Sequence, residues 1–215
     1  MLNNIYITFN NTVYRQKIGI PIGSDCAQEL ADLYLMSFEL DHVNSLLTNG
    51  DEKAESLQFA SRYIDDLLSL NDMGYIDETY SDIYPKEMKL NKTNNVSTAA
   101  NYLDLNIAIV NGKFVTRLYD KRRDYNFKII SLPHMSSNVL TNPTYGVFIS
   151  QVHRFLIANS DVKYFYDEVK GLTSKLIGQG FVKSKMKYFL CKYFFSHILD
   201  FTYKYWTHVE VDKCF

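Results

Sequence analysis

A pair of adjacent aspartates, Asp65 and Asp66, interrupts a mostly apolar stretch that runs from Phe59 to Leu70. Alternating apolar residues precede the pair and a leucine-rich run follows it, which is the pattern of two β-strands joined by a tight turn. Burying two carboxylates at the tip of a hairpin has a large cost in solvation free energy unless cations bind them. Divalent metal ions suit that role. The alternative is an ordinary turn, because aspartate favours turns for local reasons. The motifs in the neighbouring segments are therefore needed to distinguish a metal site from an ordinary turn.

Charge is distributed unevenly along the 215 residues, although the formal net charge is only -1. Residues 1–110 hold 7 Lys and Arg against 16 Asp and Glu, a net charge of -9, and residues 111–215 hold 16 against 8, a net charge of +8. An acidic half with a carboxylate pair and a basic half fit a metal site beside a polyanion-binding track. An uneven solvated surface is the simpler alternative.

The cysteine pattern predicts an intracellular, reducing compartment, without distinguishing nucleus from cytoplasm. Cys26, Cys191 and Cys214 are odd in number and far apart, so they provide neither a CxxC pair nor a disulfide framework. The N-terminus lacks the basic and apolar regions of a signal peptide. The most apolar run, Tyr188 to Trp206, is interrupted by charged residues, so we expect no membrane partner.

The order of periodicities predicts an α+β chain with two subdomains. Strand patterns with turn signals at Asn10-Asn11 and Asn111-Gly112 occupy residues 5–9, 12–18, 88–90, 101–110 and 113–119. Helical patterns occupy residues 25–47, 144–159, 161–178 and 181–206, and residues 73–84 fit a short helix or a turn. We therefore expect an αβ subdomain over residues 1–125 and a helical one over residues 126–215.

A loop rich in glycine, Gly19-Ile20-Pro21-Ile22-Gly23-Ser24, connects the first hairpin to the first helix. Its glycines let the backbone approach a partner closely, and it opens onto a helix N-terminus with free N–H groups and a positive dipole end. Ser24 or Asp25 would cap that helix. The loop suits a phosphate, sugar or base pair, and a rigid strand-to-helix connection is the alternative.

The assembled order of motifs resembles a reverse transcriptase, from the middle of the palm through the thumb. Tyr63-Ile64-Asp65-Asp66 is similar to the Tyr-x-Asp-Asp motif of that family, and the loop from Gln16 to Ser24 resembles the motif just before it. Asn91-Lys92-Thr93 resembles the later lysine motif. Tyr102-Leu103-Asp104-Leu105 and the run from Leu118 to Arg123 are closest to Penelope-like retroelement (retrotransposon) enzymes, which are relatives of telomerase. Gln151-Val152-His153-Arg154 fits their first thumb helix.

The resemblance implies an RNA-directed DNA polymerase, a nucleotidyltransferase whose fold here is a partial palm, an antiparallel sheet with helices on one face, followed by an α-helical thumb. Two Mg²⁺ or Mn²⁺ ions would serve the intact enzyme, with Asp65 as the main metal ligand of the pair and Asp66 assisting. Lys92 would protonate or neutralise the leaving pyrophosphate, with Lys89 as a weaker candidate. A solvated loop lysine is the alternative for either.

The resemblance also implies an RNA template, a DNA primer and deoxynucleoside triphosphates as partners. The nucleotide- and template-binding candidates are Gln16, Gly19, Pro21, Gly23, Ser24 and Tyr63. The candidates for gripping primer phosphates are Lys121, Arg122, Arg123 and Arg154. For Tyr63 the alternative is core packing, and for the run from Lys121 to Arg123 it is a solvated strand end.

Two parts of the family pattern have no counterpart in these 215 residues. The first palm strand, which carries another catalytic aspartate, and the fingers are missing, and neither Asp25 nor Glu29 matches that aspartate. Ile22 also stands where many relatives have Gln or Met. We therefore expect a truncated domain that has no polymerase activity alone. The alternative is a non-catalytic module of a retroelement that binds nucleic acid.

Overall fold

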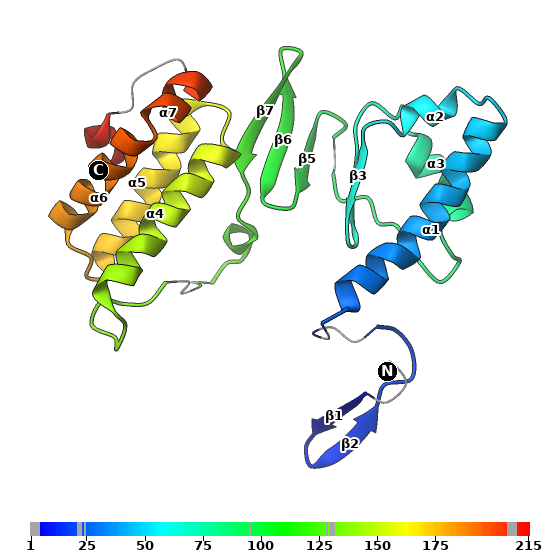
Figure 1. The fold of residues 1–215 in the computed structure, drawn as a ribbon, viewed down its shortest axis with the longest axis horizontal. Helices are drawn as coiled ribbons and strands as arrows, with labels where there is room; N and C mark the ends of the chain where they lie inside the picture. The colour runs from blue at the N-terminus through cyan, green and yellow to red at the C-terminus, as the bar shows by residue number, and fades with distance from the viewer. Residues whose placement is uncertain are drawn as a thin grey trace. The chain divides into compact units, whose positions relative to one another are not determined.

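The computed structural model of the chain describes residues 5–20, 23, 25–94, 96–127, 129, 132–205 and 210–215. Within these ranges the fold is mixed α+β, as the sequence predicts, with seven α-helices and three small antiparallel sheets (Figure 1). The chain divides into two compact units, unit 1 over Met1–Lys92 and unit 2 over Thr93–Phe215. Among the helices of the described ranges, none is both long and apolar enough to cross a lipid bilayer.

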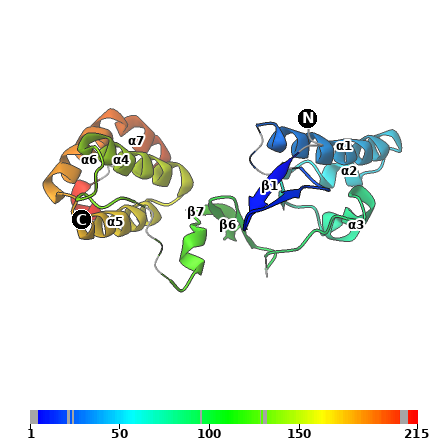
Figure 2. The same cartoon turned by 90° about the horizontal axis from the view of Figure 1, so that it is seen from below.

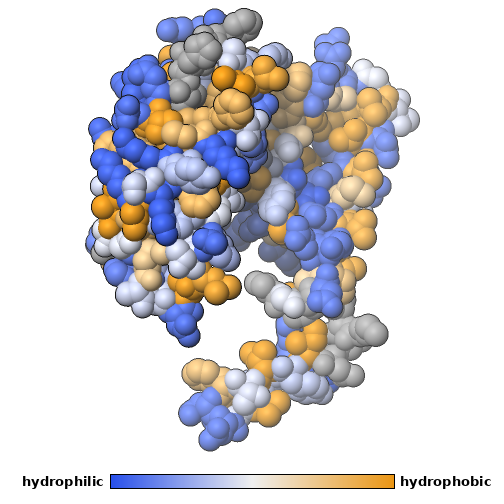
Figure 3. Space-filling view, turned by 60° about the vertical axis from the view of Figure 1, so that its left-hand side comes forward, coloured by the Kyte–Doolittle hydropathy of each residue, from blue (hydrophilic) through white to orange (hydrophobic). Residues whose placement is uncertain are grey.

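Unit 1 begins with the predicted hairpin of β1 (Tyr6–Phe9) and β2 (Thr12–Arg15). Its turn residues Asn10 and Asn11 both have positive φ, 48° and 58°, as the Asn-Asn signal predicts for a two-residue hairpin turn. Every residue of both strands is exposed, and Figure 3 shows hydrophobic side chains uncovered at the surface of this hairpin. A two-stranded hairpin with no packed face gains little stability of its own.

The rest of unit 1 packs one long helix against a second hairpin and a short helix. Its elements are α1 (Ala27–Thr48), α2 (Lys53–Ser56), β3 (Ala60–Tyr63), β4 (Asp66–Ser69) and α3 (Tyr75–Ile83), and Figure 2 shows the three helices together. The buried apolar side chains among its described residues are Leu35, Leu46, Tyr75, Ile76 and Ile83. The first helix begins after Cys26 with no side-chain cap, so the expected cap at Asp25 is wrong. Ser24, the other expected cap, lies outside the described residues.

Unit 2 joins a three-stranded meander to a helical bundle. Its strands are β5 (Ala99–Tyr102), β6 (Leu105–Val110) and β7 (Lys113–Leu118), followed by the 3₁₀ turn η1 (Lys121–Asp124). Its helices are α4 (Thr141–Ala158), α5 (Val162–Gly178), α6 (Lys183–Ser196) and α7 (Ile198–Tyr205), and a second 3₁₀ turn, η2 (Val211–Cys214), ends the chain. Figures 1 and 2 both show α4, α5 and α6 side by side.

The aromatic content of the sequence is used mainly in the core of unit 2. Phe165 is fully buried and contacts Phe201 at a ring-centroid distance of 5.4 Å and Phe194 at 6.2 Å. Asp161 caps the helix that carries Phe165, because its carboxylate accepts a hydrogen bond from the Lys163 N–H. One strand residue, Leu118, belongs to the same core.

Several expectations about the elements are wrong. The strand expected over residues 101–110 is two strands, because a tight turn at Leu103-Asp104 reverses the chain after Tyr102. The segment 88–90 forms no strand, and the helix expected over 181–206 ends at Ser196 and restarts at Ile198. The described strands also form three separate sheets rather than the one palm sheet expected.

The contact boundary at Lys92–Thr93 differs from the subdomain boundary expected after residue 125. Strand β7 is hydrogen-bonded to the end of α4, which keeps the meander with the helices. The Leu118 N–H donates to Asn159 Oδ1 over 3.1 Å, and the Ser160 N–H donates to the Thr116 carbonyl over 3.0 Å. The periodicity of the sequence separates strands from helices, but it does not show which strands pack on which helices.

Candidate functional site

The two adjacent aspartates lie at the tip of the β3–β4 hairpin. Tyr63 pairs with Asp66 across the ladder, so Ile64 and Asp65 form a two-residue turn. Ile64 has φ 54°, and Asp65 is not among the residues with positive φ, which is the pattern of a type II′ turn. A β-branched residue in this left-handed region is a conformational outlier that its surroundings must hold in place.

Arg62 provides that support from the less exposed side of β3, where its guanidinium contacts α1. Its side chain is only 12% exposed, and its Nη1 donates to Asp32 Oδ1 over 2.7 Å and to the Ile64 carbonyl over 3.0 Å. Its Nε donates to Glu39 Oε1 over 2.7 Å, and its Nη2 donates to the Asp32 carbonyl over 3.2 Å. A single guanidinium therefore connects the turn to two positions of α1, Asp32 and Glu39, that lie about two helical turns apart.

Glu39 extends this network to the segment after α3. Its Oε1 also accepts a hydrogen bond from the Tyr84 hydroxyl over 2.7 Å. Burial, and then the hydrogen bond to Glu39, raises the pKa of Tyr84 above its usual range. Burial lowers the pKa of Arg62, but the hydrogen bonds to Glu39 and Asp32 outweigh it and the pKa is raised. The network therefore favours the charged form of Arg62 and the neutral form of Tyr84.

Asp65 and Asp66 themselves are exposed, and neither carboxylate is hydrogen-bonded or ion-paired to another described residue. Hard oxygen ligands that are free of protein cations are the donors that Mg²⁺ and Mn²⁺ prefer. The donor chemistry therefore fits a divalent metal ion. The described part of the chain contains no group of three or more His, Cys, Asp or Glu that could hold one, so the pair is a partial ligand set.

The other catalytic candidates of unit 1 have local roles. Lys92 forms an ion pair with Asp77 on α3, with 56% and 47% of the two side chains exposed, and not with Asp65 or Asp66. Tyr63 on β3 is half-exposed, so packing in the core, the alternative role for this residue, involves only part of its side chain. The structure thus leaves Tyr63 accessible beside the aspartates and gives Lys92 a weak, exposed partner.

The glycine-rich loop is described only in part, because Pro21, Ile22 and Ser24 lie outside the described residues. Gly19 and Gly23 have φ 90° and 95°, which L-residues with side chains rarely adopt. The Gln16 amide Nε2 donates to the carbonyls of Ile18 and Gly19, each over 3.1 Å. Gln16 therefore braces the loop, so its amide N–H groups are already engaged within unit 1.

The four candidate phosphate-binding residues of unit 2 all line one cavity of about 830 Å³. Arg154 on α4 faces it together with Lys121, Arg122 and Arg123 of η1. The run Lys121 to Arg123 was expected at a strand end, but β7 ends at Leu118 and the run forms a 3₁₀ turn capped by Asp120. The charged side chains of the lining are Asp104, Arg117, Asp120, Lys121, Arg122, Arg123, Arg154, Asp167, Glu168 and Lys175.

Three of these four cations already have carboxylate partners. Arg122 pairs with Asp120 over 2.7 Å, and Arg154 pairs with Asp104 over 2.9 Å. Arg123 forms a two-pronged pair with Glu168, whose side chain is only 4% exposed. The hydrogen bond from Arg122 holds the pKa of Asp120 below its usual range. This cavity, called the cationic groove below, has more cationic than anionic side chains in its lining. Ion pairs with carboxylates nevertheless compensate Arg122, Arg123 and Arg154 in the absence of a ligand.

Sequence reasoning missed the residues that support the candidate sites. Arg62 stands out in the sequence as the one cation between the apolar runs of the hairpin, and that position is a signal of a buried partner. Asp32 and Glu39, seven residues apart, lie on one face of α1, as their shared contact with Arg62 shows. Glu168 gave no such signal, because an acidic residue in an amphipathic helix is usually solvated.

Comparison of the chain with protein-family models, with curated protein sequences and with solved structures finds no match to any of them. No family is therefore assigned by similarity, and the function has to be inferred from the residues and their geometry.

Proposed function

We propose that this chain is part of an RNA-directed DNA polymerase that uses two-metal nucleotidyl transfer. The observation that carries the proposal is the uncompensated pair Asp65 and Asp66 at the tip of a braced, left-handed turn. An ordinary surface turn does not need a mostly buried arginine behind it, or two adjacent carboxylates without a cation partner. In this proposal unit 1 belongs to a polymerase palm, and the helices of unit 2 form a thumb.

Each residue of the proposed site has a separate task. Asp65 and Asp66 hold the metal ions, which supply charge stabilisation for the attacking and leaving oxygens. Tyr63, half-exposed next to the aspartates, supports the primer end. Lys92 neutralises or protonates the leaving pyrophosphate, and releasing it from exposed Asp77 costs only about 0–1 kcal/mol.

Unit 2 supplies the proposed contacts to the nucleic acid. Its cationic groove holds phosphates of the primer–template duplex through Lys121, Arg122, Arg123 and Arg154. The partners are an RNA template, a DNA primer and deoxynucleoside triphosphates, in an intracellular, reducing compartment. Because the 215 residues contain only two carboxylates of the ligand set, we expect no primer extension by this chain alone.

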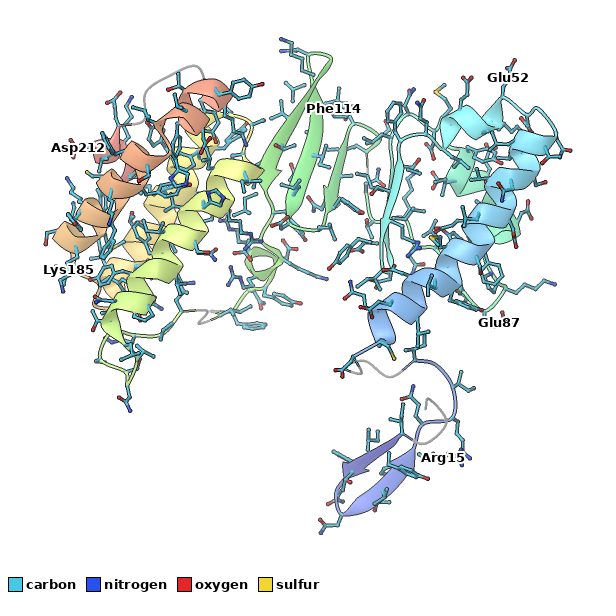
Figure 4. All side chains as sticks on the ribbon, in the orientation of Figure 1. Arg15, Glu52, Glu87, Phe114, Lys185 and Asp212 are labelled. Carbon is cyan, nitrogen blue, oxygen red and sulfur yellow. The ribbon has the colours of Figure 1, made fainter. Side chains whose placement is uncertain are left out.

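Residue-specific Mn²⁺ binding tests the proposal without requiring activity. In an NMR titration, Mn²⁺ should broaden the amide signals around Asp65 and Asp66, and Asp65→Asn with Asp66→Asn should abolish the broadening. Glu87→Gln, which removes an exposed carboxylate elsewhere in unit 1 (Figure 4), is the matched control and should change nothing. Uniform broadening over acidic residues would contradict the proposal.

A second function, a non-catalytic module that binds nucleic acid, is favoured by the groove of unit 2 alone. It predicts tight binding of an RNA–DNA duplex with no dependence on Asp65, Asp66 or divalent metal. Fluorescence anisotropy with and without Mn²⁺, on the wild type and on the double aspartate variant, separates the two functions. Equal binding of the duplex and of heparin would count against both, because it would show affinity for any polyanion.

A further inference from the structure

Arg62 holds the turn that carries Asp65 and Asp66 through its backbone, and not through the carboxylates. Its Nη1 donates to the carbonyl of Ile64, the residue with φ 54°. The same nitrogen donates to Asp32, so the carbonyl is fixed relative to α1 and not only relative to its own hairpin. The peptide between Ile64 and Asp65 is thereby fixed in orientation, and this peptide sets the direction in which Asp65 leaves the turn.

Packing behind the hairpin does not replace this support. A cavity of about 190 Å³ lies between the β3–β4 hairpin, α1 and α3, and its lining includes Arg62, Leu67, Val43 and Ile76. A hairpin that packs incompletely on its helix has freedom to shift at its tip. The guanidinium network therefore holds the tip where hydrophobic contact does not.

The charges in the network explain why Arg62 does not neutralise the aspartates beside it. Two carboxylates, Asp32 and Glu39, each lie 2.7 Å from its nitrogens, so its charge is already compensated on the α1 side. Its remaining donor interactions go to the carbonyls of Ile64 and Asp32. Arginine suits this task because its planar fork donates in several fixed directions, which a lysine ammonium cannot do.

We propose that Arg62 is a positioning residue that fixes the Ile64-Asp65 turn in the conformation that binds divalent metal. This inference rests on the proposed function of Asp65 and Asp66. It goes beyond that function because it states that metal affinity at the turn is controlled by Arg62, Asp32 and Glu39. Residues that orient metal ligands without touching the metal change metal affinity by about 10- to 100-fold when they are replaced.

The decisive variant is Arg62→Lys, which keeps the charge and loses the fork. In the NMR titration we expect its Mn²⁺ affinity at Asp65 and Asp66 to fall about tenfold, and we expect faster amide hydrogen exchange at the turn. Arg15→Lys, at the end of β2 (Figure 4), is the matched control and should leave both readouts unchanged. If Arg62→Lys fails to fold, Asp32→Asn keeps the guanidinium, removes one of its anchors and should show the same changes to a smaller degree.

Three results would overturn the inference. Wild-type Mn²⁺ affinity in Arg62→Lys with tighter binding in Arg62→Gln would show that only the charge matters. A lower melting temperature with unchanged Mn²⁺ affinity and unchanged exchange at the turn would show a purely structural role. If the wild type shows no Mn²⁺ binding that depends on Asp65, the proposed function fails. In that case amide hydrogen exchange at the turn still tests whether Arg62 fixes the conformation of the turn. An unchanged exchange rate in Arg62→Lys would overturn the inference.

Discussion

Replacing Glu168 with glutamine should strengthen nucleic-acid binding by unit 2 while it destabilises the fold. Glu168 is 4% exposed in its side chain and compensates Arg123, whose side chain is 53% exposed in the cationic groove. Glutamine keeps an oxygen for one of the two hydrogen bonds but releases the charge of Arg123. We expect a loss of about 1.5–3 kcal/mol in the free energy of unfolding, from one charge-assisted hydrogen bond.

The gain in binding follows from one additional free cation. One more phosphate contact steepens the dependence of log K on log salt by about 0.7–0.9 and strengthens binding about fivefold at 0.15 M salt. Fluorescence anisotropy of a labelled RNA–DNA duplex over a range of KCl concentrations measures both quantities. Circular dichroism at the same temperature confirms that the variant is folded.

Asp167→Asn is the matched control, because Asp167 lines the same groove next to Glu168 and has no ion pair with another described residue. It removes the same unit of negative charge without releasing an arginine. We expect a small change in affinity and no change in the salt slope. An unchanged salt slope in a folded Glu168→Gln protein, or an equal change in both variants, would refute the reasoning that Arg123 is held in reserve by Glu168.

Two further predictions concern unit 2. Asn159→Ala should lower its free energy of unfolding by about 2–3 kcal/mol, because the buried Leu118 N–H loses its acceptor; chemical denaturation measures this, and a change below 0.5 kcal/mol would mean that β7 is not held by α4. Burial and then Asp200 raise the pKa of Tyr193 to about 12 from its usual 10.0, so unit 2 should lose stability as the pH rises from 10 to 12, where the unfolded chain ionises first. Tyr193→Phe should flatten this decline in thermal melts, and an unchanged pH dependence would contradict the assignment.

The sequence predicts the elements that have a local signal. Asn10-Asn11 identifies the first hairpin, and the aspartates interrupting two apolar runs identify the turn of the β3–β4 hairpin. The turn at Leu103-Asp104 was missed because apolar alternation continues on both sides of it and Asp104 is the only typical turn residue there, with no Gly, Pro or Asn beside it. The network behind Asp65 could not be predicted, because it joins residues 23 and 30 positions apart in the chain.

The second hairpin of this kind provides an internal comparison for the first. Tyr102-Leu103-Asp104-Leu105 repeats the order tyrosine, left-handed residue, aspartate, and Leu103 has the same φ of 54° as Ile64. In that turn the aspartate is compensated, because Asp104 accepts a hydrogen bond from Arg154 over 2.9 Å. Where this backbone conformation serves the fold alone, the chain thus supplies a cation for the carboxylate.

The aspartates of the β3–β4 turn lack such a cation, although Arg62 lies only two residues before Ile64. Arg62 is instead bound to Asp32 and Glu39, and its contact with the turn is to a backbone carbonyl. Two adjacent, uncompensated carboxylates repel each other, and a divalent ion relieves that repulsion. If Asp104→Asn leaves metal binding unchanged while Asp65→Asn abolishes it, the difference between the two turns lies in their charge partners and not in their backbone.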